Sequence, residues 1–307
     1  MNKKMLFFVN PKAGQMELRN NLMEILQVFT AGGYDVTVHP TQGPEDLTHW
    51  LVQHGAEFDA VVCAGGDGTL NEAVSGLMQM ENRPPLGYIP GGTVNDVAAT
   101  LGLKRNPVEA AHDIIAGHPF ALDIGSFGPD RWFTYVAGFG AFTSVSYRTP
   151  QSDKRLLGRM AYLFNGVKSL GEIKPIPVRI TVEDQVIEDE VLVGLFCSTT
   201  SVGGFHPKME TGVRLNDGLS EIIMVKKVKT LADLNALGNL FLKGEFDPDF
   251  FYAFQTDHVR FEFPTPVSWT LDGEYGGTLQ DVELRNNQQA VEIIVPDRYL
   301  EKISPTN

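Results

Sequence analysis

The chain has few cysteines and no hydrophobic run long enough to cross a membrane. Only two of its 307 residues are cysteines, Cys63 and Cys197, and both lie in apolar strand-like runs. We therefore expect buried thiols in a reducing compartment rather than a disulfide. The apolar start of the chain is broken by Asn10 and Pro11, too early for a signal peptide, and no later apolar stretch reaches about 18 residues. These absences predict a cytoplasmic protein without a transmembrane segment.

Positive charge is also scarce. Lys and Arg number 25 against 38 Asp and Glu, which gives a formal net charge of −13. This balance argues against a general nucleic-acid binder and against non-specific adhesion to an anionic membrane. Two local basic clusters stand out: Lys154 with Arg155 and Arg159, and Lys226 with Lys227 and Lys229. Either could contact lipid head groups, but a solvated surface is the simpler interpretation of each.

Several well-known catalytic signatures are missing. No G-x-x-x-x-G-K-[ST] motif occurs, which excludes a Walker-type nucleotide site, and Asn71 stands where a dinucleotide fingerprint has its third glycine. There is no G-x-S-x-G elbow and no H-R-D motif, so the α/β-hydrolases and protein kinases that use them are excluded as well. The seven histidines show no metal-ligand spacing.

The first part of the chain alternates between strand and helix patterns. Apolar or alternating runs predict strands at residues 5–9, 34–39, 60–64 and 86–89, and helical patterns are found at residues 18–29, 45–54, 69–80, 96–101 and 107–116. Apolar runs without alternation are typical of strands that are covered on both faces. The repeated β-α-β order predicts an α/β domain at residues 1–120, with a parallel sheet between layers of helices.

The pattern changes after Gly117. Strands are predicted at residues 178–182, 191–196, 222–225, 259–263, 282–284 and 291–295, and helices at residues 156–170 and 231–241. Because Gly, Pro, Asp and Asn separate these strands, we expect a mostly antiparallel β-sandwich domain at residues 121–290. The last segment, residues 290–307, can pack back on the first domain.

A glycine-rich turn carries the strongest chemical signal. The buried strand at residues 60–64 runs directly into Gly65-Gly66-Asp67-Gly68-Thr69, and a helix follows. Glycines let the backbone approach a ligand closely, and the start of a helix offers free N–H groups to phosphate. Thr69 and Glu72 have the spacing of a capping box, which supports a helix start here. A tight strand-to-helix turn does not explain Asp67, whereas a Mg²⁺ ion held between this carboxylate and phosphates does.

Two further turns end neighbouring strands in the same way. Gly91-Gly92-Thr93-Val94-Asn95-Asp96 follows the fourth strand, and Asn10-Pro11-Lys12-Ala13-Gly14 follows the first. The carboxyl ends of parallel strands form the edge at which open α/β sheets bind ligands. Three such turns at one edge therefore predict a phosphate site.

Two segments of the second half are ambiguous by themselves. Leu271-Asp272-Gly273-Glu274 is consistent with a surface turn, although it carries two carboxylates. Arg214-Leu215-Asn216-Asp217-Gly218-Leu219 is consistent with a type I′ hairpin turn. Neither pattern identifies a site from its chemistry alone.

Taken together, the motifs resemble the diacylglycerol kinase catalytic-domain family, whose bacterial soluble lipid kinases are similar to sphingosine and ceramide kinases. The resemblance covers nearly the whole chain. Its motifs occur in order: the Asn10–Gly14 turn, Gly65-Gly66-Asp67-Gly68-Thr69-x-Asn71-Glu72, Gly91-Gly92-Thr93-x-Asn95-Asp96, Leu157-Gly158-Arg159-Met160-Ala161-Tyr162, and Leu271-Asp272-Gly273-Glu274.

The resemblance implies a lipid kinase that uses ATP and Mg²⁺, with ATP and lipid meeting in a cleft between the two domains. Asp67 and Asp96 would organise the catalytic magnesium, and Glu274 would be the general base that deprotonates the lipid hydroxyl. A second, structural magnesium would be held by the carbonyls of Arg214 and Leu219 and the carboxylate of Asp217. The nucleotide would contact Asn10, Pro11, Lys12, Ala13, Gly14, Thr41, Gly65, Gly66, Asp67, Gly68, Thr69, Leu70, Asn71 and Thr93.

The family resemblance also implies partners. We expect a lipid substrate at the inner membrane surface, transient peripheral association with that surface, and a possible homodimer, but no nucleic acid. Lys12 and Arg19 are candidate contacts to an anionic head group. One departure from the family is Ala13, which stands where a serine is common, so a hydroxyl contact to phosphate is missing there.

Two other functions remain open from the sequence. An NAD kinase also has a glycine-rich G-G-D-G-T turn before a mostly β domain, but the Gly91–Asp96 and Leu271–Glu274 motifs fit the lipid-kinase pattern better. A nucleotide-sensing module would bind ATP without turning it over, but such a module has no use for the base Glu274. The acceptor lipid is diacylglycerol by resemblance, with phosphatidylglycerol and other lipid alcohols as alternatives.

Overall fold

The computed structural model of the chain describes residues 2–12, 17–93, 95–140, 174–198, 214–243 and 245–303. Two compact units are formed, one by Met1–Leu122 with Gln289–Asn307 and the other by Asp123–Gln288. The predicted helix at residues 156–170 and the basic cluster at residues 154–159 lie outside the described residues. None of the described helices is long and apolar enough to span a bilayer.

The first unit contains four strands that pair in parallel, in the order β2–β1–β3–β4. Their bounds are β1 (Lys3–Val9), β2 (Tyr34–Pro40), β3 (Ala60–Gly65) and β4 (Leu86–Pro90). All six residues of β3 and all five of β4 are buried. These strands are covered on both faces, which explains why their sequences are apolar without alternation.

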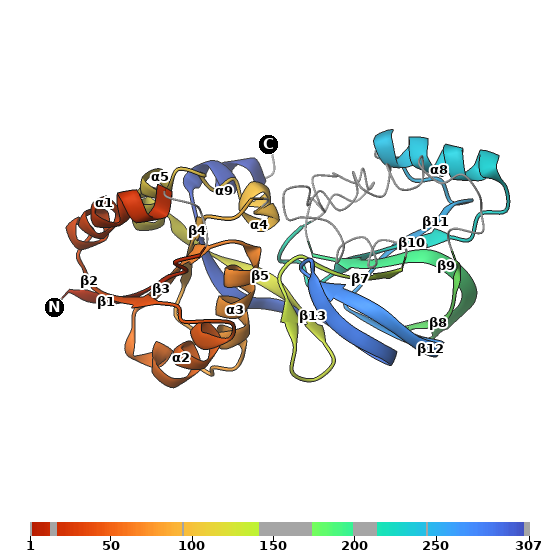
Figure 1. The fold of residues 1–307 in the computed structure, drawn as a ribbon, viewed down its shortest axis with the longest axis horizontal. Helices are drawn as coiled ribbons and strands as arrows, with labels where there is room; N and C mark the ends of the chain where they lie inside the picture. The colour runs from red at the N-terminus through yellow and green to blue at the C-terminus, as the bar shows by residue number, and fades with distance from the viewer. Residues whose placement is uncertain are drawn as a thin grey trace. The chain divides into compact units, whose positions relative to one another are not determined.

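Helices flank these strands on two sides (Figure 1). They are α1 (Glu17–Ala31), α2 (Asp46–His54), α3 (Asp67–Met78), α4 (Asp96–Thr100), α5 (Pro107–Ala116) and α9 (Asp297–Ile303), with a 3₁₀ turn at Gly55–Glu57. Helix α1 packs against α5 on one side, and α2 packs against α3 on the other. The aromatic residues Phe7 and Phe29 meet edge to face between β1 and α1, with ring centroids 5.4 Å apart. This half has the mixed α/β character that its sequence predicted.

The second unit is rich in strands, as predicted. Its elements are β6 (Trp132–Phe133), β7 (Val136–Gly140), β8 (Ile176–Val182), β9 (Gln185–Cys197), β10 (Ser220–Lys226), α8 (Leu231–Lys243), β11 (Phe251–Thr256) and β12 (His258–Leu271). It also holds parts of β5 (His118–Phe127) and β13 (Glu274–Val295), whose remaining residues belong to the first unit. Strands β7 and β8 each pair antiparallel with both β9 and β12. One aromatic-rich core, which includes Phe139, Phe261 and Trp269, is buried among them.

Strand β13 differs from the sequence prediction. Separate strands were expected at residues 282–284 and 291–295, whereas a single 22-residue strand runs through the polar residues between them. The polar side chains find partners within the fold, because Asn286 Nδ2 donates to Ser220 Oγ and Asn287 Nδ2 donates to the carbonyl of Ile124. These hydrogen bonds let the polar residues continue the ladder, although Oδ1 of Asn286 has no partner among the described residues.

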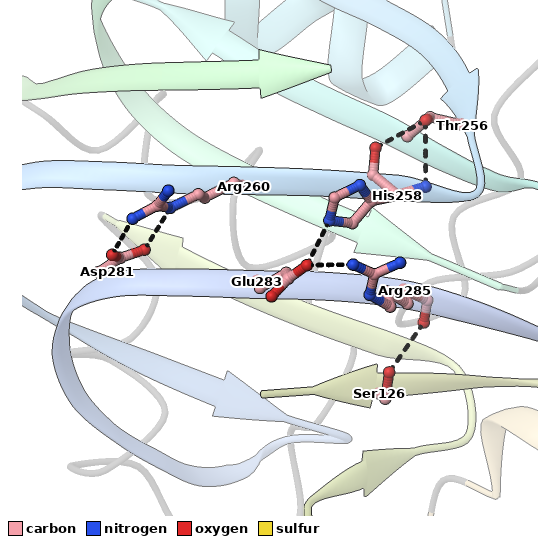
Figure 2. A network of polar contacts seen from close by, with 7 residues as sticks. All are labelled: Ser126, Thr256, His258, Arg260, Asp281, Glu283 and Arg285. Atoms are coloured by element: carbon pink, nitrogen blue, oxygen red, sulfur yellow. Dashed lines mark hydrogen bonds and ion pairs between the residues drawn. The ribbon is translucent and has the colours of Figure 1, made fainter. Parts of the chain in front are cut away.

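The exposed face of β12 and β13 carries a network of charged side chains (Figure 2). Arg260 pairs with Asp281, and Glu283 accepts from both His258 and Arg285. Arg260 lowers the pKa of Asp281. The Arg260–Asp281 and His258–Glu283 contacts link β12 to β13, and Arg285 pairs with Glu283 along β13. Because the side chains satisfy one another, we interpret the network as support for strand pairing rather than as a binding site.

Both cysteines are buried and free, as their apolar surroundings predicted. Burial raises the pKa of each thiol. Neither is therefore a reactive thiolate near neutral pH.

Candidate active site

The three predicted turns of the first unit meet at the carboxyl ends of β1, β3 and β4. The backbone N–H of Asn10 donates to the carbonyl of Ala64 at 3.1 Å, and Gly91 N–H donates to the carbonyl of Gly65 at 2.6 Å. The parallel strands thus bring segments that are far apart in the sequence to one edge.

Two of these turns approach so closely that only glycine fits. A Cβ atom on Gly92 would lie 2.8 Å from the Cα atom of Gly66 and 2.7 Å from Oδ1 of Asn95. At Gly65 a Cβ atom would lie 2.3 Å from Oγ1 of Thr69. By contrast, a Cβ atom on Gly68 would meet no protein atom within 4 Å. Gly65 and Gly92 therefore leave no room for a side chain. A Cβ atom on Gly66 would make only an ordinary contact, 3.4 Å from the Cα atom of Gly92, and Gly68 leaves the backbone open.

Asn95 fastens the glycine turns together. Its Oδ1 accepts from the N–H of Gly92 at 2.9 Å, and its Nδ2 donates to the carbonyl of the same residue at 2.7 Å. The hydroxyl of Tyr88 lies 3.2 Å from both Asn95 Oδ1 and the carbonyl of Gly65. Asn95 is 3% exposed and has a left-handed φ of 55°, a conformation that asparagine tolerates better than most residues.

The two predicted magnesium-organising carboxylates are joined through this asparagine. Asp67 begins α3, Asp96 begins α4, and the N–H of Asn95 donates to Asp67 Oδ2 at 3.0 Å. The negative charge of Asp67 also contributes, after burial, to the raised pKa of Tyr88. Carboxylates are suitable ligands for Mg²⁺, which commonly takes one or two of them and completes its shell with phosphates and water. Among the described residues, no group of three or more Asp, Glu, His or Cys side chains is arranged to hold a metal ion by itself. A magnesium ion at Asp67 and Asp96 would therefore take its remaining ligands from phosphate and water.

The first turn is held by side chains of the second. Asn10 Nδ2 donates to Oγ1 of Thr69 at 3.1 Å, and Asn10 Oδ1 accepts from the N–H of Lys12 at 2.9 Å. The N–H of Thr41 donates to the carbonyl of Val9, which places the end of β2 beside that of β1. Pro11 and Lys12 are exposed, and Ala13 and Gly14 lie outside the described residues.

The other predicted nucleotide contacts differ in exposure. Thr93 is exposed and Asn71 is half-buried. Leu70 is fully buried, and its N–H donates to the carbonyl of Gly66. Its side chain therefore belongs to the core.

The predicted capping box is wrong. Gly66, in an extended conformation, is the N-cap of α3, so Thr69 already lies inside the helix. Glu72 instead accepts from the backbone N–H groups of Glu45 and Leu47 at the start of α2, and burial raises its pKa. The motif spacing was right for a cap, but the helix begins earlier and a neighbouring helix takes the glutamate.

In the second unit, the Leu271–Glu274 segment is a two-residue hairpin turn between β12 and β13. Asp272 and Gly273 both have positive φ, 49° and 84°, as a type I′ turn requires. Asp272 is only 6% exposed, so the surface-turn interpretation was wrong for this residue. It accepts from the backbone N–H groups of Thr134, Tyr135 and Val136 and from the Thr134 hydroxyl, at 2.7–3.1 Å.

The two carboxylates of this turn have different environments. Burial raises the pKa of Asp272, although its four donors act in the opposite direction. Glu274 is exposed and its side chain makes no hydrogen bond or ion pair within the described ranges. Asp272 therefore holds the turn, whereas Glu274 is available to a ligand.

The Arg214–Leu219 segment is not a type I′ turn, because Gly218 alone has a positive φ there. The N–H of Gly218 donates to Asp123 Oδ2 at 2.7 Å, and Leu219 N–H donates to Asp217 Oδ1 at 3.1 Å. Sequence reasoning missed the fully buried Asp123. Its position inside an apolar strand, where an acid is costly without partners, was the available signal.

Comparison with known proteins now supplies independent information. The family described as "Diacylglycerol kinase catalytic domain" matches residues 4–127. The chain is 34% identical over 305 residues to a diacylglycerol kinase of Bacillus subtilis (strain 168), covering 98% of this chain and 99% of that protein. It is 35% identical over 299 residues to a diacylglycerol kinase of Staphylococcus epidermidis, covering 96% and 93%.

Solved structures of similar proteins have the same fold as this chain. A crystal structure of a diacylglycerol kinase from Bacillus anthracis str. Sterne aligns with a TM-score of 0.76 at 26% identity, covering 97% of this chain and 98% of that one. Another crystal structure from the same organism aligns with a TM-score of 0.83 at 28% identity and similar coverage.

Proposed function

Because the chain belongs to the diacylglycerol kinase family and is a lipid kinase that acts on a hydroxyl group, we propose that it transfers the γ-phosphate of ATP to a hydroxyl of diacylglycerol or a related lipid, with Mg²⁺ as the metal. The observation that carries the proposal is the joining of three glycine or asparagine turns at one strand edge, with Asp67 fastened to them through Asn95. Such an arrangement of glycine turns, a helix N-terminus and a carboxylate is suited to bind a polyphosphate with its metal ion.

The first unit is the proposed nucleotide-binding domain. Gly66 and Gly68 expose backbone at the N-terminus of the 12-residue helix α3, where free N–H groups favour phosphate. Asp67 and Asp96 would hold Mg²⁺, which supplies charge neutralisation for the transferred phosphoryl group. Other contacts to ATP are proposed for Asn10–Gly14, Thr41, Gly65, Thr69–Asn71 and Thr93.

Glu274 is the proposed general base. Its carboxylate would accept the proton of the lipid hydroxyl while that oxygen bonds to the γ-phosphorus and the bond from phosphorus to the β-γ bridging oxygen breaks, leaving ADP. Its exposure and its freedom from other contacts among the described residues support this role, and the four hydrogen bonds to Asp272 argue against the neighbouring acid.

The second unit is the proposed lipid-substrate domain, with a β-sandwich arrangement and a structural Mg²⁺ bound by the carbonyls of Arg214 and Leu219 and the carboxylate of Asp217. All three offer oxygen, the donor that Mg²⁺ prefers. We also propose a cytoplasmic enzyme that associates transiently with the inner membrane surface and forms a homodimer.

Of the three basic regions that could contact an anionic lipid surface, the one at residues 154–159 lies outside the described residues, which leaves the Lys226–Lys229 cluster and Lys12 with Arg19. Lys227 pairs with Glu190 at 2.6 Å, and Lys226 donates to the carbonyl of Pro248 and lies 4.2 Å from the ring centroid of Tyr252. Lys12 and Arg19 are exposed and form no ion pair within the described ranges. We therefore favour Lys12 and Arg19 for this role, and charge reversal of both should raise KM for lipid and weaken vesicle binding. Unchanged values would contradict it.

The decisive experiment is ATP turnover with Mg²⁺ in mixed micelles, with diacylglycerol, phosphatidylglycerol and NAD as separate acceptors. We expect lipid phosphorylation that Glu274→Gln abolishes while ATP binding is retained. Phosphorylation of NAD alone would identify an NAD kinase, and ATP binding without turnover of any acceptor would favour a nucleotide sensor. Full activity of Glu274→Gln would refute the assignment of the base.

A further inference from the structure

A β-bulge lies directly beside Glu274. On β12 and β13, Thr270 pairs with Tyr275 but the preceding Trp269 pairs with Gly277, so Gly276 is an extra residue on β13. A Cβ atom on Gly276 would lie 3.1 Å from the carbonyl carbon and oxygen of Trp269, and Gly277 has a φ of 105°. Bulges change the direction of the strand and re-aim nearby side chains, and they are frequent next to active sites.

Arg131 holds this bulge from a neighbouring loop. It lies between β5 and β6, and its Nη1 donates to the carbonyl of Gly276 while its Nη2 lies 3.4 Å from the carbonyl of Tyr275. The guanidinium carbon is 5.8 Å from the ring centroid of Phe127, and the carbonyl of Arg131 accepts from the N–H of Phe127 at 2.8 Å. The planar fork of donors that arginine provides suits two adjacent carbonyls.

Glu274 therefore lies between two fixed points, each two residues away. On one side is Asp272, with its four hydrogen bonds to residues 134–136. On the other side is the Gly276 carbonyl, held by Arg131. We infer that Arg131 is a positioning residue for Glu274, because it locks the bulge that sets the direction of that carboxylate. The inference rests on the proposed role of Glu274 as the base.

A positioning role and a merely structural role predict different results. Arg131 is exposed, so loss of its contacts should change the stability of the fold little. The reaction is more sensitive, because a displacement of about 1 Å of a reacting group can cost about a hundredfold in rate. Loss of Arg131 should thus lower kcat with little change in ATP binding.

The test compares Arg131→Gln and Arg131→Lys with the control Arg179→Gln in the full chain. Arg179 is also an exposed arginine of this unit, but it pairs with Glu188 and Glu262 rather than with the bulge. For Arg131→Gln we expect kcat for the lipid substrate to fall by about ten- to a hundredfold. The ATP dissociation constant and the melting temperature of Arg131→Gln should match those of Arg179→Gln. Arg131→Lys, which keeps a cationic donor, should recover part of kcat.

Glu274→Gln is measured alongside. If Glu274→Gln is inactive but Arg131→Gln keeps the kcat of the control, the positioning role is overturned and the proposed function is left intact. A fully active Glu274→Gln would overturn the proposed base and, with it, the positioning role. A much lower melting temperature with lost ATP binding in Arg131→Gln would make Arg131 a structural residue and also overturn the inference.

Discussion

Glu221 should make the stability of the protein depend on pH. It lies on β10, is 1% exposed, and pairs across the sheet with Cys197 and Gln255. Gln255 Nε2 donates to its Oε1 at 3.2 Å, whereas its Oε2 has no partner among the described residues. Burial raises the pKa of Glu221 from 4.5 to about 7, with smaller contributions from Asp217 and Asp123.

The direction in which stability changes with pH follows from the number of protons bound by the folded and unfolded states. Between pH 4.5 and 7 the folded protein keeps the proton on Glu221 while the unfolded chain has lost it. Stability therefore falls as pH rises through this window and then levels off. Between pH 5 and 8 the loss is about 2–3 kcal/mol, since each pKa unit corresponds to about 1.4 kcal/mol. For a unit of this size, this loss of stability corresponds to a fall of roughly 5–10 °C in melting temperature.

The perturbation is Glu221→Gln, which keeps the shape and removes the titrating group. Melting temperatures of wild type, Glu221→Gln and the exposed control Glu188→Gln would be measured by circular dichroism from pH 5 to pH 8. We expect the advantage of Glu221→Gln over wild type to grow by roughly 5–10 °C across this range, and that of Glu188→Gln to stay constant. A constant difference between Glu221→Gln and wild type would refute the reasoning.

Three further substitutions test the turns. Asp272→Asn leaves about two buried donors facing an amide nitrogen, so we expect about 2–4 kcal/mol of destabilisation in urea unfolding; a neutral result would mean that the carboxylate does not hold the turn. Gly92→Ala places a Cβ atom 2.8 Å from Cα of Gly66. It should lower the free energy of unfolding by about 1–3 kcal/mol and should also weaken ATP binding. Gly68→Ala meets no protein atom within 4 Å and should keep its melting temperature yet bind ATP more weakly in calorimetry; unchanged affinity would place the phosphates elsewhere.

Structural features that depend only on residues adjacent along the chain were predictable from the sequence. The buried strands of the first unit follow from apolar runs, and the turns after them follow from their glycines, because both are local properties of the backbone. The same motifs, in order, were enough to identify the family. Their spacing also predicted that the first part is mixed α/β and the second is rich in strands.

The sequence signal was weaker where strands depend on their partners. Strands β5, β7 and β11 were not predicted, and β13 was predicted in two pieces, because Gly, Asn and Gln within these segments resemble loop residues. In the fold, polar groups of these segments find partners on other strands, as the amide of Asn287 does at the carbonyl of Ile124, which lies 163 positions away.

By itself, then, the sequence determined the local backbone: which segments form strands covered on both faces, where glycine turns end them, and which acids follow those turns. Tertiary structure alone decided what each polar side chain does. Asp272 and Glu274 are two residues apart, yet one is buried against Thr134, 138 positions earlier, and the other is exposed. The physical reason is that burial and hydrogen bonding depend on atoms brought together from distant parts of the chain, which no local pattern encodes.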